Sequence, residues 1–171
     1  MKKKNNKKIK NNFIPTKCPY CRGKVVLKNT NDVFILPPKH LQNKNVYVCE
    51  NYPTCDAYVI QSKTSNFQGF VASEMLRKLR QITHYHIDII WKTEIITRDE
   101  CYEYLANKHK ISKNKCHIAM FDEKLCNKSI DICSDYILYN IGKIKTYKNL
   151  SEEEINTLKN IISKENIYNN D

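Results

Sequence analysis

The chain of 171 residues is long enough for one ordinary domain or two small ones, and too short for a large multi-domain enzyme. Hydrophobic residues make up 41% and charged residues 27% of it, which is typical of a globular protein. It contains only three glycines, so neither a glycine-rich phosphate loop nor a dinucleotide-binding fingerprint can be formed. Composition therefore disfavours nucleotide-driven chemistry.

The formal net charge of +11 favours a nucleic-acid partner, because phosphate backbones attract clustered cations. Lysine outnumbers arginine 25 to 4, however, and an AT-rich coding sequence favours lysine codons on its own. The distribution of charge is more informative, since residues 1–12 carry +6 and residues 149–171 carry −3. We expect residues 1–12 to form a disordered basic arm, because this Lys/Asn sequence has almost no apolar surface to bury.

The sequence contains no signal for a membrane or for secretion. Its basic start is not followed by an apolar stretch, and no later run approaches the about 18 apolar residues of a membrane span. We therefore expect a cytoplasmic protein with no membrane partner. In a reducing compartment, its eight cysteines are poor candidates for disulfides and good candidates for metal ligands or buried small side chains.

Short β-rich segments separated by turn formers follow residue 13. They predict a small antiparallel sheet with strands over residues 24–28, 32–36, 45–49 and 57–61. The polar stretch 62–66 is predicted to be a linker. Residues 13–64 are therefore assigned to one β-rich domain.

From residue 70 onward the hydrophobic period becomes helical, which predicts a long helix over residues 70–92. His84 and His86 point in different directions on such a helix, so they cannot share a metal ion, and we expect His86 to pack in the core. A second helix is predicted over residues 97–108, where Thr97 and Glu100 form a capping box.

Two further helices are predicted after residue 110. Ser112 and Asp122 are candidate N-caps for short helices over residues 113–120 and 123–133. Together with the two preceding helices they define a predicted helical domain, residues 65–133.

The remaining residues, 134–171, form a predicted C-terminal extension. Within it, residues 135–147 alternate ambiguously, and their pattern allows either a hairpin or a loose connection. The last element is a predicted amphipathic helix, because Ser151 and Glu154 form a second capping box. Its apolar stripe consists of Ile155, Leu158, Ile161 and Ile162.

Four cysteines in the β-rich domain form two pairs. Cys18 and Cys21 are separated by two residues, and Cys49 and Cys55 form the second pair. Each pair lies at the edge of a predicted strand, as the two knuckles of a zinc ribbon do. Four thiolates close the coordination of one Zn²⁺, so we expect a structural zinc site with no open position for catalysis. Gly23 is expected to permit the tight turn that points backbone amides at sulfur.

The physical need for a metal follows from the size of this domain. A β region of roughly fifty residues buries too little apolar surface to fold alone. Structural zinc supplies an apparent binding free energy on the order of 10–16 kcal/mol, which is linked to folding. The alternative is that the four cysteines merely fill a core.

The segment CENYPTC at residues 49–55, with CPYC upstream, resembles the four-cysteine zinc ribbons of type IA DNA topoisomerases, which bind single-stranded DNA. A longer stretch, from about residue 17 to residue 133, resembles a phage and prophage family of zinc-finger-containing proteins without an assigned function. The motifs that carry this second resemblance are CPYC, CDAYV, LRKLR, TRDECYEYLA and CHIAMFD. Glycines expected after CDAYV are replaced here by other residues. The resemblance implies a zinc-binding accessory protein of phage type, and it specifies no reaction.

Basic and aromatic side chains supply candidate nucleic-acid contacts. Arginine is less readily explained by AT-rich codons than lysine, and three of the four arginines fall between residues 77 and 98. A surface for phosphate contacts and base stacking could be formed by Arg22, Lys24, Tyr52, Arg77, Lys78 and Arg80. The alternative is an ordinary solvated helix face beside ordinary ribbon aromatics.

A second metal site is conceivable at Cys116, His117, Cys126 and Cys133. Helix geometry lets Cys126 and Cys133 face the same way. Their spacing is irregular, however, and free cysteines are commonly buried, so we expect buried side chains here and not ligands.

No catalytic motif stands out, since a serine nucleophile elbow and a His-Glu-x-x-His pattern are both absent. We expect a non-enzyme of the α+β class, in which an N-terminal four-cysteine zinc ribbon precedes a small helical bundle. The expected function is non-specific nucleic-acid binding with single-stranded DNA favoured. The alternative is a protein-interaction adaptor that docks on a host replication, transcription or defence machine.

Overall fold

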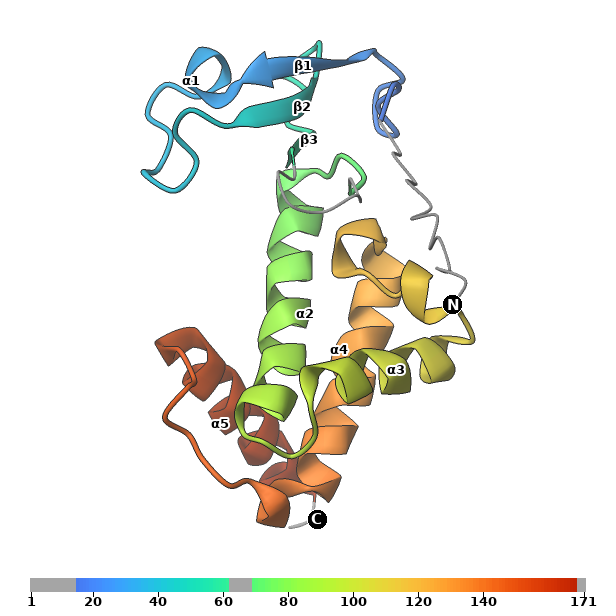
Figure 1. Ribbon diagram of the computed structural model, residues 1–171, viewed down its shortest axis with the longest axis vertical. Helices are drawn as coiled ribbons and strands as arrows, with labels where there is room; N and C mark the ends of the chain where they lie inside the picture. Colours follow the sequence, from blue (N-terminus) through green and yellow to red (C-terminus); the bar gives the residue numbers. More distant parts are fainter. Residues whose placement is uncertain (1–14, 62–68, 169–171) are drawn as a thin grey trace, which may run out of the picture. The chain divides into compact units, whose positions relative to one another are not determined.

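Figure 1 shows the computed structural model of the protein, which describes residues 15–61 and 69–168. The predicted basic arm at 1–12 and the predicted linker at 62–66 lie outside these residues. The chain divides into two compact units, Met1–Glu74 and Met75–Asp171. The first contains the sheet and the second contains the larger helices, so the fold is α+β as expected.

The first unit is built on a three-stranded antiparallel sheet in the order β1 (Val25–Asn29), β2 (Asn45–Cys49), β3 (Tyr58–Ile60). Val26 pairs with Val48 across β1 and β2, and Tyr47 pairs with Val59 across β2 and β3. The central strand is the most deeply buried, because β-branched and aromatic side chains pack well on a pleated surface. Three of the four predicted strands are therefore confirmed: β2 has the predicted ends, and the ends of β1 and β3 are shifted by one residue.

The predicted strand over residues 32–36 is wrong. The structure has the short helix α1 (Thr30–Val33) at its beginning and no strand after it. Asn29 begins this helix, because its side-chain oxygen accepts a hydrogen bond from the N–H of Asn31 at 3.0 Å. The cap at Asn29 favours a helix here more strongly than the alternating apolar pattern favours a strand. A strand at these residues would also need a neighbouring strand to pair with.

The second unit consists of four larger helices, α2 (Glu74–Lys92), α3 (Arg98–His109), α4 (Glu123–Tyr139) and α5 (Glu152–Tyr168). Between them lie the 3-10 turns η1 (Lys113–Lys115), η2 (Ile118–Met120) and η3 (Ile141–Lys143). Among the described residues, no helix is both long enough and apolar enough to cross a bilayer. The described core of this unit includes large aliphatic and aromatic side chains that are less than 2% exposed: Ile87, Ile89, Ile90, Leu105, Ile118, Phe121 and Ile137.

Helix α2 begins four residues later than predicted. Ala72 is held in an extended conformation by two backbone hydrogen bonds of 3.1 Å to Tyr58, so the helix starts only at Glu74. His86 is 7% exposed, which confirms its predicted place in the core.

Both predicted capping boxes are confirmed. The N–H of Glu100 donates to Thr97 Oγ1 at 3.3 Å, and Glu100 Oε2 accepts from the N–H of Thr97 at 2.8 Å. At α5, the N–H of Ser151 donates to Glu154 Oε2 at 2.7 Å. The other oxygen of Glu154 accepts from Lys92 Nζ at 2.5 Å, which joins α5 to the end of α2.

The predicted helix over residues 113–120 is wrong, because two separate 3-10 turns occupy the segment. Its buried side chains, Cys116 and Ile118, lie two residues apart, which is not the spacing of a helical stripe. Ser112 precedes η1 without making a side-chain capping bond.

Helix α4 is longer than predicted. Asp122 begins it as predicted, since its side chain accepts from the N–H of Leu125 at 2.8 Å. The helix continues past Cys133 to Tyr139, so the hairpin considered for residues 135–147 is wrong. The buried stripe explains the length, because it extends over a further turn to Ile137.

Candidate metal centre

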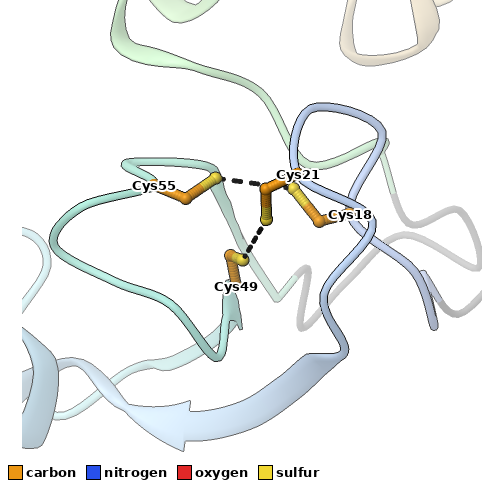
Figure 2. Close-up of side chains that lie close together, drawn as sticks. All are labelled: Cys18, Cys21, Cys49 and Cys55. Atoms are coloured by element: carbon orange, nitrogen blue, oxygen red, sulfur yellow. Dashed lines mark hydrogen bonds between the residues drawn. The ribbon is translucent and has the colours of Figure 1, made fainter.

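Four cysteine side chains converge in the first unit. Figure 2 shows that Cys18 and Cys21 come from the loop before β1, while Cys49 ends β2 and Cys55 lies in the loop after it. Their sulfur atoms all lie within 4.8 Å of one another. The structure therefore brings together all four residues predicted to bind a metal.

The sulfur separations distinguish a metal site from disulfides. The Sγ atoms of Cys18 and Cys55 are 3.6 Å apart, and those of Cys21 and Cys49 are 3.3 Å apart. A tetrahedron of sulfurs about 2.3 Å from a central zinc has edges of about 3.8 Å, whereas bonded sulfurs are about 2.05 Å apart. All four cysteines are free thiols, so their arrangement fits an ion and not covalent pairing.

The loop before β1 is a tight turn with one left-handed residue. The N–H of Cys18 donates to the carbonyl of Gly23 at 2.8 Å, and the N–H of Arg22 donates to the carbonyl of Cys18 at 3.1 Å. Arg22, with φ of 65°, adopts the left-handed conformation. The N–H of Gly23 donates to the sulfur of Cys21, as expected, but the left-handed angle of the turn does not depend on this glycine.

Gly23 is needed for a different reason, which is close approach of the second loop. A Cβ atom on Gly23 would lie 2.9 Å from Asn51 Nδ2, 3.2 Å from Glu50 Oε1 and 3.4 Å from Cys21 Sγ. Both neighbouring side chains connect the loops: Asn51 Nδ2 donates to Cys21 Sγ at 3.4 Å, and Glu50 Oε1 accepts from the N–H of Lys24 at 2.7 Å. A larger residue would displace these contacts.

The loop between Cys49 and Cys55 accommodates its five intervening residues by turning twice. The N–H of Tyr52 donates to the carbonyl of Cys49 at 3.1 Å, and the N–H of Cys55 donates to the carbonyl of Asn51 at 3.0 Å. The five-residue spacing of this pair is therefore compatible with a compact site, as is the two-residue spacing of Cys18 and Cys21.

Backbone and side-chain N–H groups support the thiolate forms. Hydrogen bonds to the sulfur lower the pKa of Cys21 to about 6. The N–H of Gly23 has the largest effect and the side-chain amide of Asn51 the next largest. Burial raises the pKa of Cys49 to about 12 and also raises that of Cys55, against the effect of backbone N–H groups at Asn51 and Ala57. Each of these three backbone donors lies two residues after its cysteine. Burial resists a cluster of bare thiolates, so the site needs a cation to hold four of them together.

The donor set and its surroundings fit one structural zinc ion. Four thiolates are the soft ligands that zinc takes in closed tetrahedral sites. The core beneath them is small, consisting of buried Tyr47, Ala57 and Val71 beside Cys18 and Cys49. A unit with so small a core is the kind that depends on a metal for its stability.

No second metal site is present in the parts of the chain that the structure describes, where the four cysteines are the one group of this kind. Cys116, Cys126 and Cys133 are at most 4% exposed, and burial raises the pKa of each thiol. His117 instead begins η2, where its Nδ1 accepts from the N–H of Ala119 at 3.3 Å. These cysteines act as small core side chains, as the simpler interpretation predicts.

The candidate nucleic-acid contacts divide between the two units. The first unit carries Arg22, Lys24 and Tyr52, and α2 in the second unit carries Arg77, Lys78 and Arg80. Arg80 has a structural contact, because its Nε–H donates to the carbonyl of Phe121 at 3.0 Å. It connects α2 to the segment before α4.

A groove of about 640 Å³ lies on the first unit, and the rings of Phe34, Tyr52 and Tyr58 line it. The ring centroid of Phe34 is 5.9 Å from that of Tyr52 and 4.9 Å from that of Tyr58. Ile35 and Leu36 extend its apolar lining and are 98% and 89% exposed. We call these five residues the ribbon groove.

Sequence reasoning identified only Tyr52 in the ribbon groove. It placed residues 34–36 in a strand, where alternate side chains would have been covered. The turn-forming run from Asn29 to Asp32 and the pair Pro37-Pro38 were the signals that a loop stands here. Asn51 and Glu50 were also missed, because no spacing rule singles out residues that connect two loops.

A four-thiolate site on a three-stranded antiparallel sheet defines the class of protein as a zinc finger of the ribbon type. The chain belongs to a family with a zinc-finger-containing domain, which matches residues 14–136. Neither the curated proteins nor the solved structures include a match to the sequence. The resemblances to phage proteins and to topoisomerase ribbons therefore stay sequence-based interpretations.

Proposed function

We propose that the protein is a zinc-binding accessory protein of phage or prophage type that binds nucleic acid with little sequence specificity. It acts in the cytoplasm and prefers single-stranded DNA to duplex. The zinc ion is structural in this proposal, and the protein catalyses no reaction.

The observation that carries the proposal is the ribbon groove. Three aromatic rings beside exposed apolar side chains offer stacking surfaces for unpaired bases, which any base can use because every base has a π face. Lys28 lines the same groove, and Arg22 and Lys24 are exposed on the same unit. A net charge of +11 supports attraction to a polyanion.

Binding of this kind depends on counterion release and on stacking. Affinity should therefore fall steeply with salt. Arg77 and Lys78 of α2 are further phosphate contacts in this proposal, so R77Q/K78Q should reduce the slope of log affinity against log salt for single strands by about one to one and a half.

Fluorescence anisotropy of a labelled oligothymidine tests the proposal with the full-length, zinc-loaded protein. At about 150 mM salt we expect a dissociation constant in the range of about 1 μM to 100 μM, with weaker binding of the matching duplex. Y52L should weaken single-strand binding by about fivefold or more, because stacking is worth about 1–3 kcal/mol per base. Y139L is the matched control, since Tyr139 is 84% exposed and belongs to the second unit. No saturable binding, or equal losses in both variants, would exclude the groove as a nucleic-acid site.

The second candidate function is the protein-interaction adaptor, and the exposure of Ile35 and Leu36 favours it. Adjacent large apolar side chains that are almost fully exposed are typical of a protein-docking surface. I35S/L36S should abolish docking on a protein partner, because it replaces both exposed apolar side chains with small polar ones. Undetectable oligonucleotide binding by the wild-type protein would favour this second function.

A further inference from the structure

A pocket of about 770 Å³ lies in the second unit between α2, α4 and α5. Part of its lining is apolar and comes from Ile82, Ile130, Leu138 and Ile161. The polar part includes His86 of α2, Asp131 and Asp135 of α4, and Lys164 of α5. We call it the helical pocket. None of its residues belongs to the zinc site or to the ribbon groove.

His86 presents one hydrogen-bond acceptor to the helical pocket. Its side chain is 7% exposed, and its Nδ1 lies 2.9 Å from the carbonyl of Ile82. A carbonyl only accepts, so Nδ1 carries the proton and Nε2 of the neutral ring is an acceptor. Burial lowers the pKa of His86, which favours this neutral form.

The Nε2 atom of His86 has no hydrogen-bond partner among the described residues, although the side chain is buried. His86 is one of the residues that line the helical pocket. An acceptor held in one orientation in a buried position is suited to a ligand that donates an N–H.

The carboxylates of Asp131 and Asp135 provide the charge of the helical pocket. They lie one turn apart on α4, where two like charges repel each other. Neither carboxylate has an ion pair or a hydrogen bond in the described parts of the chain, and both residues are exposed. Lys164 is the single cation in the lining, so negative groups outnumber it two to one.

These observations select one kind of ligand. We infer that the helical pocket binds an ammonium group on an apolar stem, which donates to His86 Nε2 and is neutralised by Asp131 and Asp135. The stem packs against the isoleucine and leucine side chains of the lining. The ammonium group belongs either to a free alkylamine or to a lysine side chain of another protein.

A divalent metal ion is not the favoured ligand, although a histidine and two carboxylates often bind one. In the described residues, the ligand atoms of these three side chains are not close enough to share an ion, whereas those of the four cysteines are. An ammonium group on a flexible stem can contact acceptors that lie further apart.

Nuclear magnetic resonance of the His86 ring, with the zinc-loaded full-length protein, tests this inference without nucleic acid. Addition of n-butylamine should shift the ring signals to saturation, and n-butanol should bind at least about tenfold more weakly because it lacks the charge. A short peptide with one internal lysine separates the two sources. Tighter binding of the peptide than of butylamine assigns the pocket to a protein partner, and equal or weaker binding assigns it to a free amine.

D131N/D135N is the decisive variant. Asparagine preserves the shape of each side chain and removes the repulsion on α4, so the variant should fold, and Trp91 fluorescence checks that it does. We expect at least about a tenfold loss of butylamine affinity, with no loss in E94Q/E103Q, which removes two exposed carboxylates outside the pocket. Equal binding of butylamine and butanol, an unchanged affinity in D131N/D135N, or the absence of a saturable shift would overturn the inference.

Discussion

At the scale of single residues, Arg22 and Gly23 have different structural roles in the first metal-binding turn. Arg22 holds the left-handed backbone angle, which costs a side-chain-bearing residue roughly 1–2 kcal/mol. Gly23 has an ordinary angle and instead leaves room for Asn51 and Glu50. The sequence predicted the turn and the Gly23 amide that points at sulfur, but it gave no sign that Arg22 takes the left-handed angle or that a distant loop packs against Gly23.

This division predicts opposite effects for two neighbouring substitutions. Arg22→Gly should stabilise the first unit by about 1 kcal/mol, because glycine adopts the left-handed conformation at no steric cost. Gly23→Ala should weaken zinc binding, because its Cβ displaces Asn51 from Cys21. Competition with a chromophoric zinc chelator measures both variants. Equal affinities for the wild type and Gly23→Ala would show that the contact between loops does not support the site.

The metal-site residues themselves were predictable, whereas their supporting contacts were not. Paired cysteines at strand edges identify Cys18, Cys21, Cys49 and Cys55 without any tertiary information. The amide donors and the ribbon groove depend on how two loops meet, and one loop contains the strand that was predicted wrongly. A site whose residues are marked by short-range spacing can be predicted from a sequence. Contacts between loops that are distant in sequence can be identified only once the fold is known.

At the scale of elements, local signals at helix starts were largely reliable, with Ser112 as the exception because it makes no capping bond. The capping boxes at Thr97 and Ser151 and the cap at Asp122 were all confirmed, because each is satisfied within one turn of chain. Helix boundaries at which no cap was predicted were less predictable. Helix α4 continues beyond its predicted end because tertiary burial of Ile137 extends it, and α2 starts late because Ala72 pairs with a strand.

Removal of one of these caps should cost a measurable amount of stability. Thr97→Ala leaves the N–H of Glu100 without its acceptor, and we expect a loss of about 1 kcal/mol in the free energy of unfolding of the second unit. Urea unfolding followed by the fluorescence of Trp91, the single tryptophan, measures it. Ser112→Ala is the control, because Ser112 makes no capping bond and should cost much less. A loss of the same size in both variants would contradict the assigned role of Thr97.

Acid should destabilise the helices. Burial lowers the pKa of four histidines, His84, His86, His109 and His117, below the ordinary value of 6.5. Above pH 6.5 all four are neutral in both the folded and the unfolded chain, so their contribution to stability is complete. As the pH falls below 6.5, the unfolded chain takes up protons that the folded chain resists, and stability is lost.

Urea unfolding at pH 7.5 and at pH 5.5, again read from Trp91, measures this loss. The second unit should be less stable at the lower pH, and His86→Gln should reduce the difference because glutamine does not titrate. A second unit equally stable at both values would mean that these histidines are protonated as easily in the folded protein as in the unfolded one.

At the scale of the whole molecule, the two units differ in what holds them together. The second has many buried apolar side chains on α2, α3 and α4, whereas the first has a small core that includes two of the four clustered cysteines. A metal ligand and a core cysteine should therefore respond differently to the same substitution. Cys49 is a ligand candidate and Cys133 is a fully buried residue of α4, so these two cysteines form a matched pair for comparison.

Cys49→Ser should abolish tight zinc binding and unfold the first unit, since structural zinc contributes on the order of 10–16 kcal/mol to such domains. The fluorescence of Trp91 and the helical circular dichroism signal should survive, because α2 to α5 do not depend on the ion. Cys133→Ser should keep zinc and instead destabilise the helices by burying a poorly matched hydroxyl. Retention of zinc by Cys49→Ser would remove that residue from the site.

Native mass spectrometry of the full-length protein, purified under reducing conditions without added metal, tests the central claim most directly. We expect one zinc ion per chain, all eight cysteines without disulfide bonds, and loss of the ion together with unfolding of the first unit when a strong chelator is added. A metal-free chain with a folded first unit, or a mass that reveals disulfides among Cys18, Cys21, Cys49 and Cys55, would contradict it.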